Sequence, residues 1–165
     1  KSTGEVMGIG ADFSSAFAKS QLGAGARLPS SGAVFISVKD KDKQAAAALA
    51  GRLSGLGFTL MATDGTAVTL TDAGLPVRRI NKVLQGRPHC EDAIINGAVQ
   101  LVINTTEGAQ AIRDSFSIRR SALMKNVPHY TTIAGAAAAV DAIEALLSGQ
   151  GLDVAPLQSY FPVFA

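Results

Sequence analysis

The residues best suited to binding chemistry are hydroxyl, amide and ammonium side chains at the ends of four apolar runs of the sequence. They are Ser37 in the first run, Thr63 at the end of the second with Thr66 shortly after it, Lys82 after the third, and Asn104, Thr105 and Thr106 at the end of the fourth, with Lys39, Lys41 and Lys43 close behind Ser37. Hydroxyls and amides donate hydrogen bonds, lysine adds positive charge, and little acid accompanies them. This chemistry predicts an anion pocket suited to phosphate. Taken one at a time, such residues are more often helix N-caps or solvated lysines.

An alternation of strand-like and helix-like segments would bring these side chains together. Apolar runs predict strands at 33–38, 58–63, 77–81, 101–104 and 129–133. Helical segments separate and follow them, at 40–57, 65–74, 89–98, 107–124 and 134–149. The alternation indicates an α/β fold with a parallel sheet, right-handed crossovers and helices on both faces. Ligands of such sheets bind beyond the carboxyl ends of the strands, where the polar side chains are expected.

The first 26 residues differ from this alternation. One helix is predicted in them, beginning at Asp12 or Ser14 and ending at Gly23. A Gly-, Pro- and Ser-rich stretch, 23–32, then reads as a linker. The predicted division is residues 1–26 for the tail of a preceding domain with its linker and residues 27–165 for the main domain.

Length and composition narrow the function classes. The chain has 165 residues, 47% apolar and 5% aromatic, which suits one layered α/β domain. A net charge of +2 does not suggest nucleic-acid binding, and no apolar run is long enough to span a membrane. The single cysteine, Cys90, favours a reducing, cytoplasmic setting. The chain begins without methionine, so we interpret it as a domain from a longer protein; residues 150–165 receive no assignment.

Two other clusters carry weaker signals. His89 and Cys90 precede two acidic residues, but the only other histidine is His129, so a helix start is favoured over a metal site and no metal is predicted. Three arginines, at 113, 119 and 120, lie on the predicted helix 107–124 and are interpreted as an interface with a neighbouring domain or subunit, or as solvated side chains.

Four stretches of the sequence resemble a known family. SVKDKDK, FTLMATDGTA, INKVLQGRPHCEDAIINGAVQLVINTTEG and DSFSIRRSAL are similar to the C-terminal allosteric domain of the carbamoyl phosphate synthetase large subunit, a methylglyoxal-synthase-like domain. STGEVMG resembles the end of the ATP-using half that precedes this domain. The resemblance implies a three-layer α/β/α sandwich around a five-stranded parallel sheet, with residues 27–165 as the effector-binding domain.

The resemblance also implies a regulatory function. The full enzyme would be a glutamine-hydrolysing, ATP-dependent ligase that makes carbamoyl phosphate from glutamine or ammonia, bicarbonate and ATP, for pyrimidine and arginine biosynthesis. This domain would be non-catalytic and would bind UMP as inhibitor, IMP at an overlapping site, and ornithine as activator. It would need no cofactor of its own, whereas the full enzyme would use ATP, Mg²⁺ or Mn²⁺, and K⁺. Its protein partners would be the other domains of the large subunit and the small glutaminase subunit.

Individual positions match the functional residues of the family. The nucleotide and phosphate contacts match Ser37, Lys43, Thr63, Thr66, Lys82, Asn104, Thr105 and Thr106, with Asp114 near the ribose or base. Thr131 matches an ornithine contact. Beside it, Tyr130 stands where the best-known bacterial pattern has an acidic residue, so the ornithine match is the weaker one.

Three other functions use the same fold. A lyase of the methylglyoxal synthase type would act on a triose phosphate, but it needs a histidine at the end of the first strand, where this chain has SVKDKDK. The cyclohydrolase domain of purine synthesis shares part of the pattern, but a double glycine is replaced by DGTA. An interaction module without a ligand is the third alternative.

Overall fold

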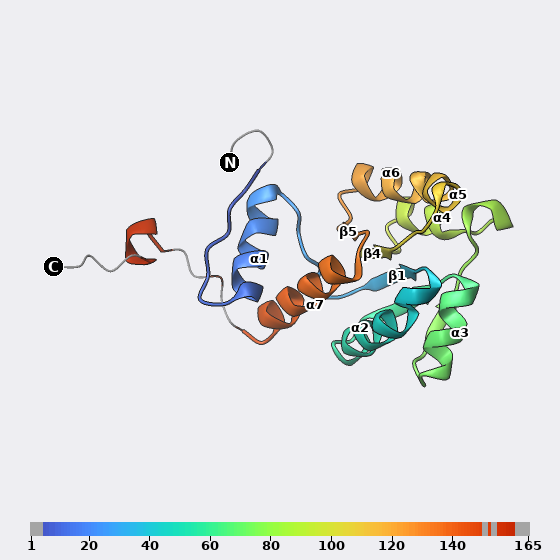
Figure 1. The fold of residues 1–165 in the computed structure, drawn as a ribbon, viewed down its shortest axis with the longest axis horizontal. Helices are drawn as coiled ribbons and strands as arrows, with labels where there is room; N and C mark the ends of the chain where they lie inside the picture. Colours follow the sequence, from blue (N-terminus) through green and yellow to red (C-terminus); the bar gives the residue numbers. More distant parts are fainter. Residues whose placement is uncertain (1–4, 150–151, 153–154, 161–165) are drawn as a thin grey trace.

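The computed structural model describes residues 5–149, 152 and 155–160. Five parallel strands form one sheet in the order β3-β2-β1-β4-β5, with helices on both of its faces (Figure 1). The strands are β1 (Ala33–Ser37), β2 (Thr59–Ala62), β3 (Val77–Arg79), β4 (Leu101–Asn104) and β5 (His129–Tyr130). The predicted α/β fold with a five-stranded parallel sheet is therefore confirmed.

The helices divide between the two faces of the sheet. Those of the described residues are α1 (Phe13–Ala24), α2 (Lys43–Gly55), α3 (Asp64–Asp72), α4 (Cys90–Ile95), α5 (Ala109–Asp114), α6 (Phe116–Met124) and α7 (Ile133–Leu147). Helices α2, α3 and α7 cover one face, and α4 and α6 cover the other. Short 3₁₀ turns lie at η1 (Asp40–Asp42), η2 (Val83–Gln85) and η3 (Leu157–Tyr160). No helix among the described residues is long and apolar enough to cross a membrane.

Strand β1 lies in the middle of the sheet, and its side chains belong to both hydrophobic cores. Val34 and Ile36 belong to the core beneath α2, α3 and α7, whereas Phe35 belongs to the core beneath α4 and α6. All three are 0% exposed. A strand that is covered on both faces has a continuous apolar sequence instead of an alternating apolar and polar one, which explains the sequence AVFI.

The predicted helix at 107–124 is wrong in one respect, since it is two helices that meet at Ser115. The Ser115 hydroxyl donates a hydrogen bond to the carbonyl of Ile112 at 3.1 Å. A serine that bonds to the preceding turn in this way bends a helix. Gly108, at φ 81°, immediately precedes α5 and sets its start one residue beyond.

Several other element ends differ from prediction by a few residues, and those of the first helix and the last strand have a clear physical reason. The first helix runs through Gly23 to Ala24 and is capped by Gly25, whose φ of 86° is the left-handed conformation typical of a helix end. The strand predicted at 129–133 ends at Tyr130 because Thr132 caps α7, its hydroxyl accepting the N–H of Gly135 at 3.1 Å.

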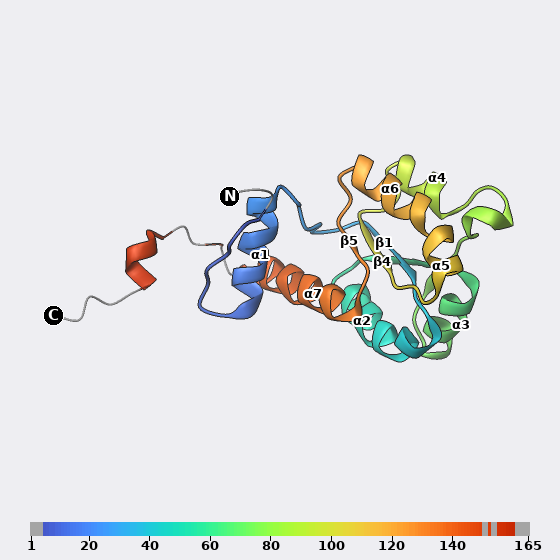
Figure 2. The same cartoon turned by 45° about the horizontal axis from the view of Figure 1, so that its top comes forward.

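Helix α1 lies alongside α7, at the end of the molecule away from α3 (Figures 1 and 2). The side chain of Asp12 caps α1 by accepting the N–H of Ser15 at 2.8 Å. Tyr130 at the end of β5 donates its hydroxyl to the Gln21 side chain at 3.2 Å, and this contact ties α1 to the sheet. The division of the chain after residue 26 stays a prediction.

An ion-pair network joins α2 to α7. Arg52 donates to both carboxylate oxygens of Glu144, Nε to Oε1 at 2.8 Å and Nη2 to Oε2 at 2.6 Å, and it also pairs with Asp141. These hydrogen bonds hold the pKa of Arg52 above its usual value and that of Glu144 below 4.5. The bidentate geometry makes this pair stronger than an ordinary surface pair.

We expect Arg52→Met to lower the free energy of unfolding by about 1 kcal/mol at pH 7, the upper range for exposed pairs. Because the pKa of Glu144 is lower in the folded state, its contribution is complete above pH 4.5 and is lost as the pH falls through the folded value. The difference between the two proteins should therefore shrink in urea unfolding at pH 3. Arg27→Met, at an exposed arginine of the connecting segment, is the control. A deficit of equal size at both pH values would contradict the ion-pair explanation.

Candidate functional site

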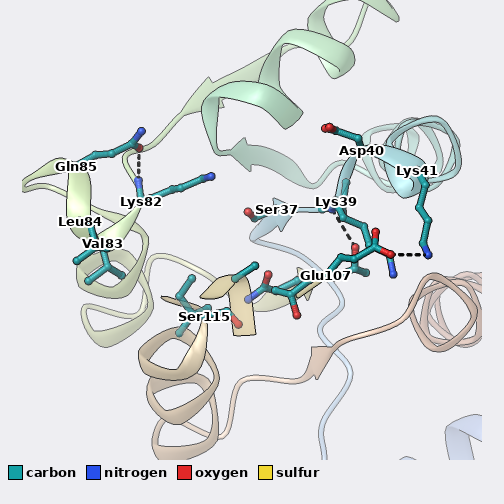
Figure 3. A pocket seen from close by; sticks show the side chains of 16 residues that line it. Ser37, Lys39, Asp40, Lys41, Lys82, Val83, Leu84, Gln85, Glu107 and Ser115 are labelled. Atoms are coloured by element: carbon teal, nitrogen blue, oxygen red, sulfur yellow. Dashed lines mark hydrogen bonds and ion pairs between the residues drawn. The ribbon is translucent and has the colours of Figure 1, made fainter. Parts of the chain in front are cut away.

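A cavity of about 590 Å³ opens at the carboxyl ends of β1 and β4 (Figure 3). The chain runs outward from β1 through β2 to β3, and then returns to the other side of β1 to form β4. Neighbouring strands whose connections leave in opposite directions create a crevice, and ligands of open α/β sheets bind there. The cavity therefore lies where the topology of the sheet predicts a binding site.

Five of the nine predicted nucleotide-site residues line this cavity: Ser37, Lys82, Asn104, Thr105 and Thr106. The register of the sheet explains why residues far apart in sequence meet there. Ser37 and Asn104 are partners across β1 and β4, and the Thr105 N–H donates to the Ser37 carbonyl at 3.1 Å. Lys82 arrives from the turn after β3, and its side chain extends toward Ser37 (Figure 3).

Three threonine hydroxyls near the cavity each accept an N–H. Thr66 Oγ1 accepts the Val38 N–H at 3.2 Å, and Thr105 Oγ1 accepts the Lys39 N–H at 3.2 Å. Thr106 Oγ1 accepts from Arg119 Nη2 at 2.9 Å. A hydroxyl oxygen that accepts one hydrogen bond keeps its own proton to donate. Hydroxyls held in this way are suited to a ligand that only accepts, such as a phosphate.

Asn104 provides an unsatisfied donor at the same place. Its side chain is buried, and its Nδ2 has no hydrogen-bond partner among the described residues. A buried amide without a partner costs about 1–3 kcal/mol, and such groups are rare in native proteins. The amide therefore points to a ligand that accepts its hydrogen bond.

Thr63 and Thr66 lie one layer behind the cavity wall rather than on it. They are 3% and 2% exposed, at the start of α3. The Thr63 hydroxyl shares a hydrogen bond of 3.0 Å with that of Ser37, which does line the cavity. Their effect on a ligand in this cavity would therefore pass through Ser37 and the backbone after it.

Two lysines near the cavity, Lys41 and Lys43, are each paired with a carboxylate. Lys43 contacts Asp40 at 2.8 Å, and Lys41 contacts Glu107, which also lines the cavity, at 3.1 Å. The hydrogen bond from Lys43 holds the pKa of Asp40 below its usual value, and Glu107 raises the pKa of Lys41. Lys43 is a predicted site residue but does not line the cavity. Its ammonium lies near Gly65, where an added Cβ would be 3.4 Å from Nζ.

Arg119 and an apolar end of the cavity were not predicted. Arg119 is expected at an interface or in solvent, whereas its guanidinium donates to Thr106. The apolar lining comes from Val83 and Leu84 in η2 and from Ile118 in α6. Arg119 directly follows Ile118, and this position was the only sequence signal that Arg119 lies near the site. Using that signal requires knowing which face of α6 meets the strand ends.

The remaining predicted residues lie elsewhere. The side chain of Asp114 is outside the described part of the structure. Thr131 is exposed and does not line the main cavity. Its neighbour Tyr130 lines a second cavity of about 290 Å³ beside the end of α1, and burial raises the pKa of this tyrosine to about 12.

His89 and Cys90 form the start of α4. His89 Nδ1 accepts the Asp92 N–H at 3.3 Å, and the Asp92 carboxylate accepts the His89 N–H at 3.1 Å, which together make a capping box. Among the described residues, no group of three or more His, Cys, Asp or Glu side chains could hold a metal ion.

Comparison with known proteins gives one family and several similar sequences. A model of the MGS-like domain family matches residues 45–131. The chain is 56% identical over 161 residues to the carbamoyl phosphate synthase large chain of Mesorhizobium japonicum, and 58% identical over 161 residues to that of Rhizobium meliloti. Each alignment covers 98% of this chain but 14% of the relative. The chain thus spans about one seventh of the length of the curated relatives it matches.

Two further matches agree with these. The carbamoyl phosphate synthase large chain of Myxococcus xanthus is 54% identical over 165 residues, which is 100% of this chain and 15% of the relative. Among solved structures, one titled "Crystal structure of ForH" is similar, with a TM-score of 0.55, 21% identity, and coverage of 80% of this chain and 84% of that one. At this identity the structural match supports the fold alone.

Proposed function

Because the chain belongs to the MGS-like domain family, we propose that it is the regulatory domain of a carbamoyl phosphate synthase large chain and binds a nucleoside monophosphate in the cavity between β1 and β4. The 54–58% identity to segments of such large chains supports the first part. The observation that carries the second is the buried Nδ2 of Asn104, without a partner among the described residues, beside hydroxyls that keep their protons to donate.

In this proposal the two ends of the cavity take different parts of the ligand. The phosphate lies against Asn104, Thr105 and Thr106 and is neutralised by Lys82. The nucleoside lies toward the apolar side chains of Val83, Leu84 and Ile118, with Asp114 near the ribose or base. Thr63 and Thr66 support the end of β1 from behind the cavity wall. When the ligand binds, Lys43 leaves its ion pair with Asp40 and pairs with the phosphate instead.

The proposed effectors and setting follow from the same assignment. UMP would inhibit and IMP would bind at the overlapping site, while ornithine would act near Thr131 at the boundary with a neighbouring domain. The full cytoplasmic enzyme, with its small glutaminase subunit, would make carbamoyl phosphate from glutamine or ammonia, bicarbonate and ATP, for pyrimidine and arginine synthesis. The ATP, Mg²⁺ or Mn²⁺ and K⁺ of that reaction would bind outside this domain. Regulation requires that each effector bind two states of the enzyme unequally.

A second candidate, a lyase acting on a triose phosphate, is favoured by two carboxylates at the cavity. Asp40 and Glu107 line the cavity and could serve as bases. However, Lys43 holds the pKa of Asp40 below its usual value, and Lys41 pairs with Glu107 at 3.1 Å. Stabilised carboxylates are weak bases, and no histidine is among the described residues that line the cavity. These features favour binding over turnover.

Calorimetric titration with UMP, IMP, inorganic phosphate and dihydroxyacetone phosphate tests the proposal. We expect saturable binding of UMP or IMP, tighter than that of inorganic phosphate, and no methylglyoxal from dihydroxyacetone phosphate. Thr106→Ala should weaken nucleotide binding, whereas Thr71→Ala, at an exposed threonine of α3, should not. Absence of nucleotide binding at millimolar concentration, or production of methylglyoxal, would overturn the proposal.

A further inference from the structure

Arg119 and Arg120 are adjacent in sequence but lie in different surroundings. Arg119 is half-buried, and its Nη2 donates to Thr106 Oγ1 at 2.9 Å. Its Nε is buried and has no hydrogen-bond partner among the described residues. Arg120 is exposed and lines a separate groove between α4 and α6. The two arginines of α6 therefore point to different sides of the helix.

The contact of Arg119 with Thr106 changes what the threonine can do. An arginine has only donors, so the Thr106 oxygen must accept, and the hydroxyl proton is turned away from the guanidinium. Hydrogen bonds in series strengthen one another, and a charged donor strengthens them further. Thr106 lines the cavity whereas Arg119 does not. The charge of Arg119 therefore acts on a ligand in the cavity through the Thr106 hydroxyl.

The other threonines of the site differ in this respect. Thr66 and Thr105 accept from backbone N–H groups, which carry no net charge. Thr106 alone among these three accepts from an ionised side chain. A hydroxyl polarised by a neighbouring cation donates a stronger hydrogen bond, by about 10–30% per bond, and a phosphate-type anion, which only accepts, gains more from this than a neutral ligand does.

We propose that Arg119 is a positioning residue of the anion site, which orients and polarises the Thr106 hydroxyl toward a phosphate-type anion without contacting the anion itself. This inference rests on the proposed function of the cavity. It also gives Arg119, expected at an interface or in solvent, a role in supporting a binding site. Arg120, on the other side of α6, has no part in anion binding.

The test compares Arg119→Met with Arg120→Met, which removes the same charge from the same helix. Calorimetric titration uses inorganic phosphate and UMP as probes, and thermal unfolding checks that each variant is folded. Arg119→Met should weaken the binding of both probes about tenfold, the lower range for a hydrogen bond to a charged group. Arg120→Met should leave affinity within about twofold, as expected of a surface charge screened by salt. Arg119→Gln, which keeps an N–H donor but not the charge, should give a smaller loss.

A double-mutant cycle separates positioning from a general structural role. If Arg119 acts through Thr106, Arg119→Met in the Thr106→Ala background should cause almost no further loss of affinity, because the hydroxyl it orients is gone. Losses that multiply, or an unchanged affinity in Arg119→Met, would overturn the inference. If that variant does not fold, an unchanged affinity in Arg119→Gln overturns it instead. A failure of the unchanged chain to bind either probe would instead refute the proposed function, and this inference would fall with it.

Discussion

Replacing Asn104 with aspartate should weaken the binding of UMP and of inorganic phosphate by about 100-fold or more, since the change reverses an interaction of roughly 1.5–3 kcal/mol and adds repulsion. The two side chains have the same shape, but the aspartate presents a charged acceptor where the asparagine presents a donor. Asn104 is 3% exposed, so water and salt screen this repulsion poorly. Calorimetric titration at pH 8 measures the loss.

Two variants control this prediction. Asn104→Ala removes the amide without adding charge, so its loss should be smaller, at about tenfold. Asn96→Asp places the same charge at an exposed position after α4, away from the cavity, and should leave affinity unchanged. Equal losses in Asn104→Asp and Asn104→Ala would mean that no negative charge approaches this amide, which would contradict the phosphate pose.

Lys82→Ala should weaken the binding of phosphate-containing ligands by about 1.5–3 kcal/mol, or roughly 10- to 150-fold, which is the range for a hydrogen bond to a charged group. Lys82 is the cavity-lining residue whose ammonium extends toward Ser37 in Figure 3. Because the side chain is exposed, the loss should be greatest at low ionic strength and shrink as salt is added.

Lys125→Ala is the matched control for Lys82. This lysine is also exposed, but it lies at the end of α6 and lines the groove between α4 and α6 instead of the main cavity. Titration of both variants with UMP at two salt concentrations separates a local contact from the overall charge of the molecule. Equal losses in the two variants, or none in Lys82→Ala, would remove Lys82 from the site.

The sequence was sufficient to predict the sheet and the centre of the site because both depend on local pattern and on one topological rule. The run AVFI is buried on both faces, and such strands are apolar throughout. Once the strands are parallel, their carboxyl ends share one edge, so Ser37 and Asn104 must approach each other. The resemblance to the MGS-like family, drawn from SVKDKDK and INTTEG among other motifs, is confirmed by the family match.

The parts that sequence did not predict depend on side-chain packing between distant elements. Ser115 interrupts the predicted long helix through a hydrogen bond to Ile112, which no helical periodicity reveals. The break is followed by α6, from which Arg119 reaches Thr106. Likewise, the sequence placed Thr63 and Thr66 together with Ser37 at the strand ends, but could not show that they lie behind it.

The most direct test of the central claim, that the cavity between β1 and β4 binds a phosphate-type anion, is a titration followed by amide nuclear magnetic resonance. UMP and inorganic phosphate are added separately to the ¹⁵N-labelled chain. We predict saturable shifts of the Asn104 side-chain amide and of the backbone amides of Lys39 and Thr105, larger with UMP than with phosphate. Shifts confined to the groove between α4 and α6 or to the cavity beside Tyr130, with the Asn104 amide unmoved, would contradict the claim.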